Sequence, residues 1–448
     1  MRILLVGGGV TGSHLAEQCC ADGHDVVVVD SNPEALAALE SRLDLMTIRG
    51  NGADPDILER ADVERADLLV AVTDSDETNL LACIFGKARG VDRTVARVAA
   101  SSYAASRHVD FAKLGVDLIV NQYEEHARDI FNAIRFPGSI EADGLLDDRV
   151  LVLGMPVHMD SPLCGRRLRD FAASPWIRAL RFFAVVRAGD ISAPSGDTLF
   201  SVGDGVYFAG EPDGVSDFMR WAWPDTRPFQ RVVVAGGCEL GLQLARLLER
   251  TRLQVTLVER DPDRADSCAE KLNRALVVKG DGIDRLTLAG LGDPASIAYV
   301  AATGDDEDNI VGCLVADALG VPFTAAQLAK RDLIEAVKKR NLVDRVADAN
   351  LALVNAILHF IRGKHVRAAA RLSLLPGEFT GFRLSPSHPW VGVRIRDLDL
   401  PPGIVLVTLL RQNAVLTPVG DLALAAGDDV IAYSTLEARP RLDPFIRA

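Results

Sequence analysis

The chain of 448 residues is long enough for two to four domains of ordinary size, each with its own hydrophobic core. Its 49 Lys and Arg residues are outnumbered by 62 Asp and Glu residues, and the net charge of −13 argues against nucleic-acid binding by phosphate neutralisation. A hydrophobic content of 48% beside a charged content of 25% is typical of a globular protein and excludes a disordered or fibrous chain.

The sequence contains neither a membrane-spanning segment nor an export signal that we can identify. The longest apolar run, Leu351 to Ile361, is interrupted by Asn355 and His359 and is shorter than the ~20 residues that span a bilayer. Met1 leads almost directly into an apolar segment, without the parts of a secretory signal. We therefore expect a cytoplasmic protein.

The spacing of cysteine and histidine predicts no metal site and no disulfide framework. The seven cysteines contain no Cys-x-x-Cys pair, and the eight histidines contain no pair at the spacing of a zinc-binding helix.

Residues 1 to 135 alternate between apolar strand patterns and helical patterns. The run Val26 to Val29 is apolar throughout, which is typical of a parallel strand buried on both faces. The alternation predicts a doubly wound parallel sheet covered by helices. The expected strands are 3–6, 25–29, 45–48, 68–72, 94–98 and 117–120. The expected helices follow Gly12 and Pro33, begin at Glu77 and span 124–134, with a short helix after the third strand and a helix after the fifth.

Residues 148 to 225 have a different pattern, in which strands at 150–157, 182–187 and 206–209 are separated by turn residues. This pattern predicts a small α+β domain. We expect an acidic, glycine-containing linker from Pro137 to Asp148 and a second linker from Trp223 to Arg231.

The sequence repeats itself, which decides the predicted architecture. The turn from Gly7 to Gly12 returns at 236–241, and the segment from Thr73 to Asn79 returns in nearly the same register at 303–309. The Gly-Asp pair at 203–204 returns at 427–428. We predict an α/β fold of two Rossmann-like doubly wound parallel sheets, each followed by a small α+β domain. The predicted nucleotide-binding domains are 1–136 and 231–362, and the small domains are 148–225 and 370–448.

The first glycine-rich turn predicts a dinucleotide site, because it follows a strand and opens a helix. Gly7 permits the tight turn, Gly9 lets the backbone approach a pyrophosphate, and Gly12 allows helix and strand to pack closely, with the helix N-terminus toward the phosphates. Asp30 ends the second strand, where a carboxylate would accept the ribose hydroxyls and repel a 2′-phosphate. NAD(H), ATP or ADP is therefore favoured over NADP(H).

Other polar residues lie at the carboxyl ends of the predicted strands, where such sheets bind ligands. Asn51 and Thr73 are site candidates, although each could equally be a turn or cap residue. The run from Asp74 to Asn79 opens a helix, and we interpret it as a helix cap and not as a metal loop. Arg97 could reach a phosphate, and it could equally form a structural salt bridge.

The second glycine-rich turn is an imperfect copy of the first. Cys238 replaces the central glycine and would place a side chain where a pyrophosphate must approach, and Glu239 adds a negative charge. Gln327 stands at the position of Arg97 and removes a positive charge. We predict one intact site and one weakened site per chain. The weakened site retains Gly236, Gly241, Glu259, Asp281 and Thr303.

These motifs resemble those of the TrkA family, the cytoplasmic subunits of bacterial Trk-type potassium uptake systems with tandem regulator-of-potassium-conductance (RCK) domains. The resemblance covers essentially the whole chain, and its most specific parts are 73–79, 96–98, the repeated Gly-Asp pairs and Leu-Pro-Pro-Gly at 400–403. Asn51 departs from the acidic residue often found at its position. The resemblance implies a pyrophosphate held by Gly7, Gly9, Val10, Thr11 and Gly12, a ribose held by Asp30, a rim of Thr73 and Asp74, and Arg97 on the phosphate side.

The resemblance further implies a regulatory role with no catalytic residues. Members of the family assemble eight such domains into a ring beneath a membrane potassium transporter, so a tandem chain would form a homotetramer. ATP or NADH would favour an open shape of the ring, and ADP or NAD a closed one. Each nucleotide would act through its different affinities for the two shapes. An NAD-dependent dehydrogenase and a nucleotide sensor with a different partner are the alternative functions.

Overall fold

The structure, a computed structural model, describes residues 1–104, 109–146, 149–224, 229–362, 375, 377–412, 414–435 and 437–446. The chain divides into two units, and each unit combines segments from both halves of the sequence. One unit contains Met1–Phe131 and Gln230–Ile361, and the other contains Asn132–Phe229 and Arg362–Ala448. The predicted domain limits at 148, 225, 370 and 448 lie outside the described residues.

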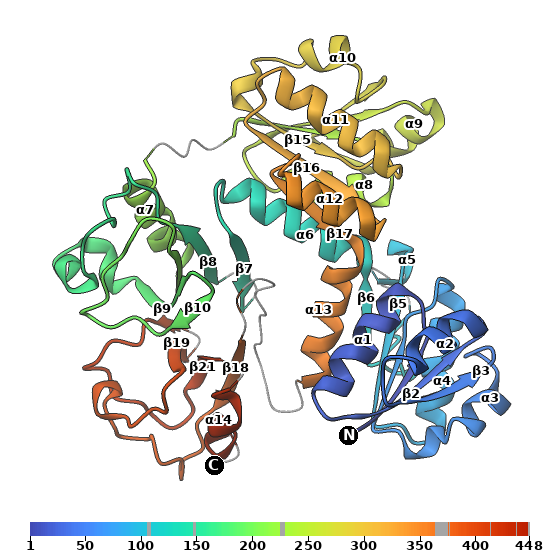
Figure 1. Cartoon of the computed structure of the whole chain (residues 1–448), viewed down its shortest axis with the longest axis horizontal. Helices are drawn as coiled ribbons and strands as arrows, with labels where there is room; N and C mark the ends of the chain where they lie inside the picture. Colours follow the sequence, from blue (N-terminus) through green and yellow to red (C-terminus); the bar gives the residue numbers. More distant parts are fainter. Residues whose placement is uncertain are drawn as a thin grey trace. The chain divides into compact units, whose positions relative to one another are not determined.

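The first half of the sequence forms a six-stranded parallel sheet in the order β3-β2-β1-β4-β5-β6 (Figure 1). Val26 to Val29 are each at most 2% exposed, because helices cover both faces. The order confirms the doubly wound prediction, with its reversal between β1 and β4. The strands are β1 (Arg2–Val6), β2 (Asp25–Asp30), β3 (Met46–Arg49), β4 (Leu68–Ala71), β5 (Arg93–Val98) and β6 (Leu118–Asn121), and the helices are α1 (Val10–Ala21), α2 (Pro33–Glu40), α3 (Pro55–Arg60), α4 (Asp76–Ala88), α5 (Ser101–Ala104) and α6 (Gln122–Arg135).

The second half repeats this topology with a six-stranded parallel sheet in the order β14-β13-β12-β15-β16-β17. The sequence repeat is therefore a repeat of the whole fold. Its strands are β12 (Arg231–Ala235), β13 (Gln254–Glu259), β14 (Leu276–Lys279), β15 (Ile297–Ala301), β16 (Phe323–Leu328) and β17 (Arg345–Asp348), and its helices are α8 (Glu239–Leu248), α9 (Pro262–Lys271), α10 (Arg285–Ala289), α11 (Asp306–Ala318), α12 (Arg331–Arg340) and α13 (Ala349–Arg362).

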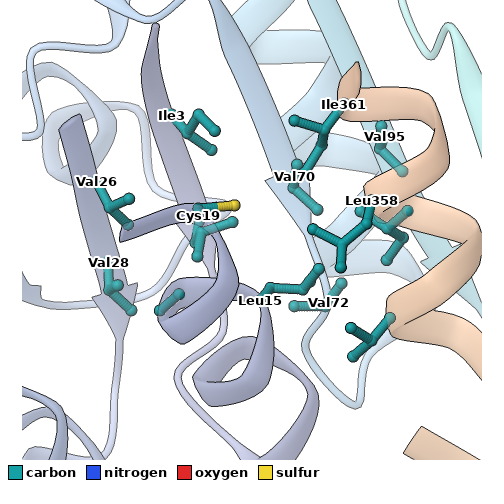
Figure 2. Close-up of a cluster of buried hydrophobic side chains, with 14 of the residues drawn as sticks. Ile3, Leu15, Cys19, Val26, Val28, Val70, Val72, Val95, Leu358 and Ile361 are labelled. Carbon is teal, nitrogen blue, oxygen red and sulfur yellow. The ribbon is translucent and has the colours of Figure 1, made fainter. Parts of the chain in front are cut away.

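Helix α13 follows the second sheet along the chain but packs on the first sheet. Figure 2 shows Leu358 and Ile361 of this helix beside Val70 and Val95, in the same buried cluster as Leu15 of α1. The other buried members of that cluster on α13 are Leu353, Val354 and Ile357. The last helix of the second half therefore completes the hydrophobic core of the first nucleotide-binding domain.

Polar contacts also join the two halves of the sequence within this unit. Arg93, at the start of β5, donates to the carbonyl oxygens of Phe360 and Ile361, and its guanidinium lies 4.3 Å from the centre of the Phe360 ring. In the opposite direction, Asp129 of α6 pairs with Arg345 of β17 at 2.6 Å. Each of these helices thus joins one half of the sequence to the sheet of the other half.

The second unit contains two small antiparallel sheets, which confirms the predicted α+β character. Their inner faces share one apolar core, in which Phe183 lies 5.2 Å from Phe379 and 5.1 Å from Tyr433 between ring centres. The first sheet has the order β10-β9-β11-β8-β7, with β7 (Glu141–Leu145), β8 (Val150–Pro156), β9 (Leu180–Arg187), β10 (Asp190–Ser192), β11 (Gly205–Gly210) and helix α7 (Pro212–Ala222). The second has the order β18-β21-β19-β20, with β18 (Glu378–Arg383), β19 (Ile404–Arg411), β20 (Ala414–Leu416), β21 (Asp429–Ser434) and helix α14 (Arg439–Ile446).

Both predicted linkers are wrong in part. Residues 141–145 of the first form the edge strand β7, which pairs antiparallel with β8. Asp143 and Gly144 have low strand propensity, so only the pairing with β8 defines this strand. At the start of the second linker, Trp223 is 5% exposed and its indole N–H donates to the carbonyl oxygen of Pro156 at 2.8 Å, so it belongs to the small-domain core.

The repeated Gly-Asp pairs hold the same ion pair in both small domains. Arg187 donates two hydrogen bonds of 2.7 Å to the carboxylate of Asp204, and Arg411 donates two of 2.8 Å to the carboxylate of Asp428. Burial alone would raise the pKa of Asp204, but hydrogen bonds from Arg187 and from the Ser201 N–H outweigh it, so this pKa lies below its ordinary value. The pKa of Asp428 is lowered in the same way.

We expect Asp204→Asn to lower the free energy of unfolding at pH 7 by about 1.5–3 kcal/mol, the usual contribution of hydrogen bonds to charged groups. Since the folded state has the lower pKa, the stabilisation is complete above the unfolded pKa of about 4 and is lost as the pH falls through the folded value. Urea unfolding from pH 7 to pH 3 should therefore show the gap to wild type closing below pH ~4.

Asp217 provides the control, because this exposed carboxylate pairs with Arg220 on the surface of α7. Asp217→Asn should change stability by less than about 1 kcal/mol at every pH. A gap between wild type and Asp204→Asn that stayed constant down to pH 3 would contradict the assigned pKa direction.

Candidate functional site

The candidate site lies where the strand order reverses, at the carboxyl ends of β1 and β4. Gly7 follows β1 with a φ of +110°, a conformation that favours glycine, and its N–H donates to the Val29 carbonyl oxygen at 2.8 Å. A Cβ on Gly12 would lie 1.8 Å from the carbonyl oxygen of Gly7, whereas a Cβ on Gly9 would meet nothing within 4 Å. The turn is therefore closely packed at Gly7 and Gly12 and open at Gly9.

The start of α1 offers backbone N–H groups to a ligand. Gly9 is the N-cap residue, and no side chain caps the helix there. Val10 is 57% exposed, whereas the Thr11 side chain is buried. The N–H groups of a first helical turn have no partners within the helix, and they favour an anion such as a phosphate.

Asp30 lies beside this turn, as its predicted role requires. Its two carboxylate oxygens accept the N–H groups of Gly8 at 2.5 Å and of Asn32 at 2.7 Å. The carboxylate thus supports the glycine-rich turn, and it is only partly buried. A substitution of Asp30 would affect the turn as well as any bound ribose.

The other two uncharged candidates have structural partners. Asn51 is exposed and accepts the Ala53 N–H at 3.0 Å, as a turn residue does. Thr73 directs both its N–H and its hydroxyl to Oδ1 of Asn79, at 2.9 and 2.7 Å. Ser75 caps α4 by accepting the Thr78 N–H at 3.1 Å, which confirms the helix-cap interpretation of this segment.

Asn79 is a structural residue of the site that sequence reasoning did not single out. It is fully buried, and its Nδ2 donates to the carbonyl oxygens of Thr73 at 2.9 Å and Arg97 at 3.0 Å. Asn79 therefore joins the ends of β4 and β5 to the first turn of α4. The signal was its place in the repeated segment, where Asn309 likewise contacts Thr303 and Gln327.

Arg97 and Asp74 face each other at the same edge. Nη1 of Arg97 lies 3.0 Å from Oδ1 of Asp74 and 3.4–3.5 Å from the carbonyl oxygens of Val72 and Thr73. The Asp74 side chain is fully exposed, whereas the Arg97 side chain is 16% exposed. The salt bridge that the sequence analysis gave as the alternative role of Arg97 is thus present, and its cation lies beside the carbonyl oxygens of Val72 and Thr73.

The second glycine-rich turn has the same backbone conformation as the first, but it has a side chain where Gly9 has none. Gly236 has a φ of +109°, and a Cβ on Gly241 would lie 2.0 Å from the Gly236 carbonyl oxygen, as in the first half. Cys238, the N-cap of α8, directs its sulfur to the Ala302 carbonyl oxygen at 2.9 Å. Burial raises the pKa of this thiol, although the N–H groups of Gly241 and Leu240 act in the opposite direction. A neutral sulfur therefore lies beside the amides that a phosphate would use.

The remaining residues of the second region mirror the first. Glu259 is 3% exposed and accepts the N–H groups of Gly237 at 2.6 Å and Asp261 at 2.8 Å. Asp281 accepts the Ile283 N–H at 3.1 Å, just as Asn51 accepts the N–H of the residue two positions after it. Within the described part of the chain, no group of three or more His, Cys, Asp or Glu side chains has the arrangement of a metal site.

The fold and these turns define a class of protein: tandem Rossmann-like nucleotide-binding domains, each followed by a small antiparallel domain. The sequence model of the TrkA-N domain matches residues 3–122 and 232–348, and that of the TrkA-C domain matches residues 148–222 and 379–446. The chain belongs to the TrkA family.

Relatives of full length support this assignment. The chain is 27% identical over 453 residues to the Trk system potassium uptake protein TrkA of Azorhizobium caulinodans, covering 100% of this chain and 99% of that protein. It is 26% identical over 458 residues to TrkA of Vibrio alginolyticus, covering 99% and 100%.

Solved structures share the fold. The GsuK channel bound to NAD matches with a TM-score of 0.62 and 19% identity, over 100% of this chain and 79% of that chain. The GsuK RCK domain matches with a TM-score of 0.61 and 19% identity, over 100% and 95%. The Rossmann-like fold class is confirmed by this agreement. Across the described residues, no helix combines the length and apolar character needed to cross a membrane.

Proposed function

We propose that this chain is a nucleotide-binding regulatory subunit of a Trk-type potassium uptake system. It acts from the cytoplasmic face of the membrane on a separate transporter subunit, and NAD(H) or ATP and ADP shift its assembly between two shapes. The names of its full-length relatives support the potassium-transport role. The predicted site residues of the first half, with the exception of Asp74, are proposed as the nucleotide ligands.

The observation that carries the proposal is the contrast between the two glycine-rich turns. The first leaves open space at Gly9 beside the N-terminus of α1. In the second, Cys238 stands in place of the glycine, and its sulfur contacts the Ala302 carbonyl oxygen. We therefore propose one nucleotide per chain, bound by the first half, with the second half serving as scaffold.

A homotetrameric ring is part of the proposal, and exposed apolar side chains at matching positions support self-association. Leu81 on α4 is 42% exposed, and Val311, at the corresponding position of the repeat on α11, is 50% exposed. Leu314 on α11 adds a further side chain that is 41% exposed. Because both halves present an apolar helix surface, one kind of contact can recur around a ring of repeated domains.

The histidines of the small domains give no support to the alternative dehydrogenase. His388 is 3% exposed, with one ring nitrogen 2.9 Å from the Phe445 carbonyl oxygen and the other accepting the Trp390 N–H at 3.1 Å. Such a fully engaged imidazole has no free nitrogen for proton transfer to a substrate. His158 is exposed in a turn of the first small domain.

Calorimetric titration of the full-length protein with ATP, ADP, NADH and NAD tests the proposal. We expect about one nucleotide per wild-type chain, and a loss of affinity of about tenfold or more in Gly9→Cys, equivalent to ~1.4 kcal/mol. Gly9→Cys is sharper than Asp30→Ala, because Asp30 also supports the turn. The matched control is Cys238→Ala, whose methyl group still stands where Gly9 leaves open space in the first turn, so affinity and stoichiometry should be unchanged.

Four outcomes would count against the proposal. Two nucleotides per wild-type chain would show that Cys238 does not block the second turn, and no binding would remove nucleotide regulation. Sustained turnover of hydroxy or amino acids with NAD would favour a dehydrogenase. A pull-down from native membranes without a Trk-type transporter would favour a nucleotide sensor with another partner.

A further inference from the structure

The first nucleotide region contains an ion pair whose two members differ strongly in burial. Arg97 has a side chain that is 16% exposed and is set against the carbonyl oxygens at the end of β4. Asp74 has a fully exposed side chain, and its carboxylate is held by the 3.0 Å bond to Arg97. The cation is therefore held in place by the fold, whereas the carboxylate is free to leave at little cost to packing.

The second half lacks both members of this pair. In the repeat, Gly304 stands at the position of Asp74, and Gln327 stands at the position of Arg97. The same half carries Cys238 in place of Gly9. Thr303 nevertheless directs its N–H and its hydroxyl to Oδ1 of Asn309, as Thr73 does to Asn79, so these bonds do not need the ion pair. The pair accompanies the open glycine-rich turn and is absent beside the closed one.

From this we infer that Asp74 is a displaceable counter-ion of Arg97, which a ligand phosphate must replace, and not itself a nucleotide ligand. The inference rests on the proposed nucleotide-binding function and departs from the rim role that the family resemblance implies for Asp74. A carboxylate and a phosphate compete for one guanidinium, because both form charge-assisted hydrogen bonds to it. Asp74 thus lowers the affinity for phosphate-bearing ligands and makes it depend on phosphate charge.

The effect has a definite sign and size. An ion pair with one fully exposed member contributes about 0.2–1 kcal/mol, so its removal should tighten nucleotide binding by at most about fivefold. Asp74→Asn should therefore bind ADP and ATP two- to fivefold more tightly than wild type. Adenosine, which carries no phosphate, should bind both proteins equally.

The experiment is calorimetric titration of full-length wild type, Asp74→Asn, Arg97→Gln and Glu64→Gln with adenosine, AMP, ADP and ATP at two salt concentrations. Glu64 is the matched control, because its exposed carboxylate pairs with Arg89 at 2.9 Å at the opposite end of β4. Glu64→Gln should bind as wild type does. Arg97→Gln should weaken ADP and ATP but not adenosine, and the gain in Asp74→Asn should shrink at high salt.

Each result bears on the inference separately from the proposed function. Tighter binding of phosphate-bearing ligands in Asp74→Asn, with adenosine unchanged, supports it. Weaker binding would show that Asp74 is a ligand, and unchanged binding would show that the pair does not compete with phosphate; either overturns the inference while leaving the proposed function intact. A wild-type protein that binds none of the four compounds overturns the inference, and one that also binds neither NADH nor NAD overturns the proposed function as well.

Discussion

Replacing Leu358 by Ala is expected to lower the free energy of unfolding of the full-length protein by about 2–5 kcal/mol, the range for truncating a buried leucine. Leu358 is 2% exposed and packs in the core of the first nucleotide-binding domain, beside Val72 and Leu15 (Figure 2). The lost contacts leave a cavity between α13 and the first sheet, so the effect of a substitution in the second half of the sequence falls on the first half.

Urea unfolding followed by circular dichroism measures this change. Leu286→Ala is the control, because Leu286 on α10 is 82% exposed and its truncation removes no core contact. It should change the free energy of unfolding by no more than ~0.5 kcal/mol. Hydrogen exchange should further show that Leu358→Ala loosens α1, against which α13 packs. Equal stability of the two variants would contradict the packing of α13 on the first sheet.

Gly12→Ala should destabilise the protein by about 1–3 kcal/mol and abolish nucleotide binding at the first site. Helix propensity alone predicts the opposite, because alanine stabilises a helix interior by up to ~1 kcal/mol relative to glycine. The new Cβ, however, would lie 1.8 Å from the carbonyl oxygen of Gly7. Helix α1 would have to move away from β1, and its first N–H groups would no longer face the position of the phosphates.

Gly9→Ala separates stability from binding in this test, since its Cβ would meet nothing within 4 Å. We expect its thermal unfolding to match wild type and its affinity for ADP to fall, because the methyl group would occupy the open space. Differential scanning calorimetry and ADP titration of both variants give the comparison. A Gly12→Ala protein as stable as wild type would show that the turn can relax around the new side chain.

Much of the fold could be predicted because its signals are local and repeated. Uniformly apolar runs such as Val26 to Val29 indicate a parallel strand buried on both faces, whatever lies elsewhere in the chain. The glycine-rich turn has a backbone requirement at Gly7 and a packing requirement at Gly12, and each admits glycine alone. The helix cap at Ser75 was likewise predictable, because capping depends on neighbouring residues.

Contacts between distant residues were beyond such reasoning. Strand β7 exists through its pairing with β8, since Asp143 and Gly144 give it no propensity of its own. The apolar face of α13 indicates burial but not the partner, and only the packed structure shows that it covers the first sheet. In the candidate site, too, local features could be predicted and contacts between distant residues could not.

The sequence by itself determined the tandem repeat, the Rossmann-like class and the residues of the glycine-rich turns, because periodicity and spacing are read along the chain. The tertiary structure decided the pairing of Arg97 with Asp74, the bonds of Asn79 and the position of the Cys238 sulfur. These depend on which strand ends are brought together at one sheet edge, and that arrangement is set by the summed packing of both halves and not by any local segment.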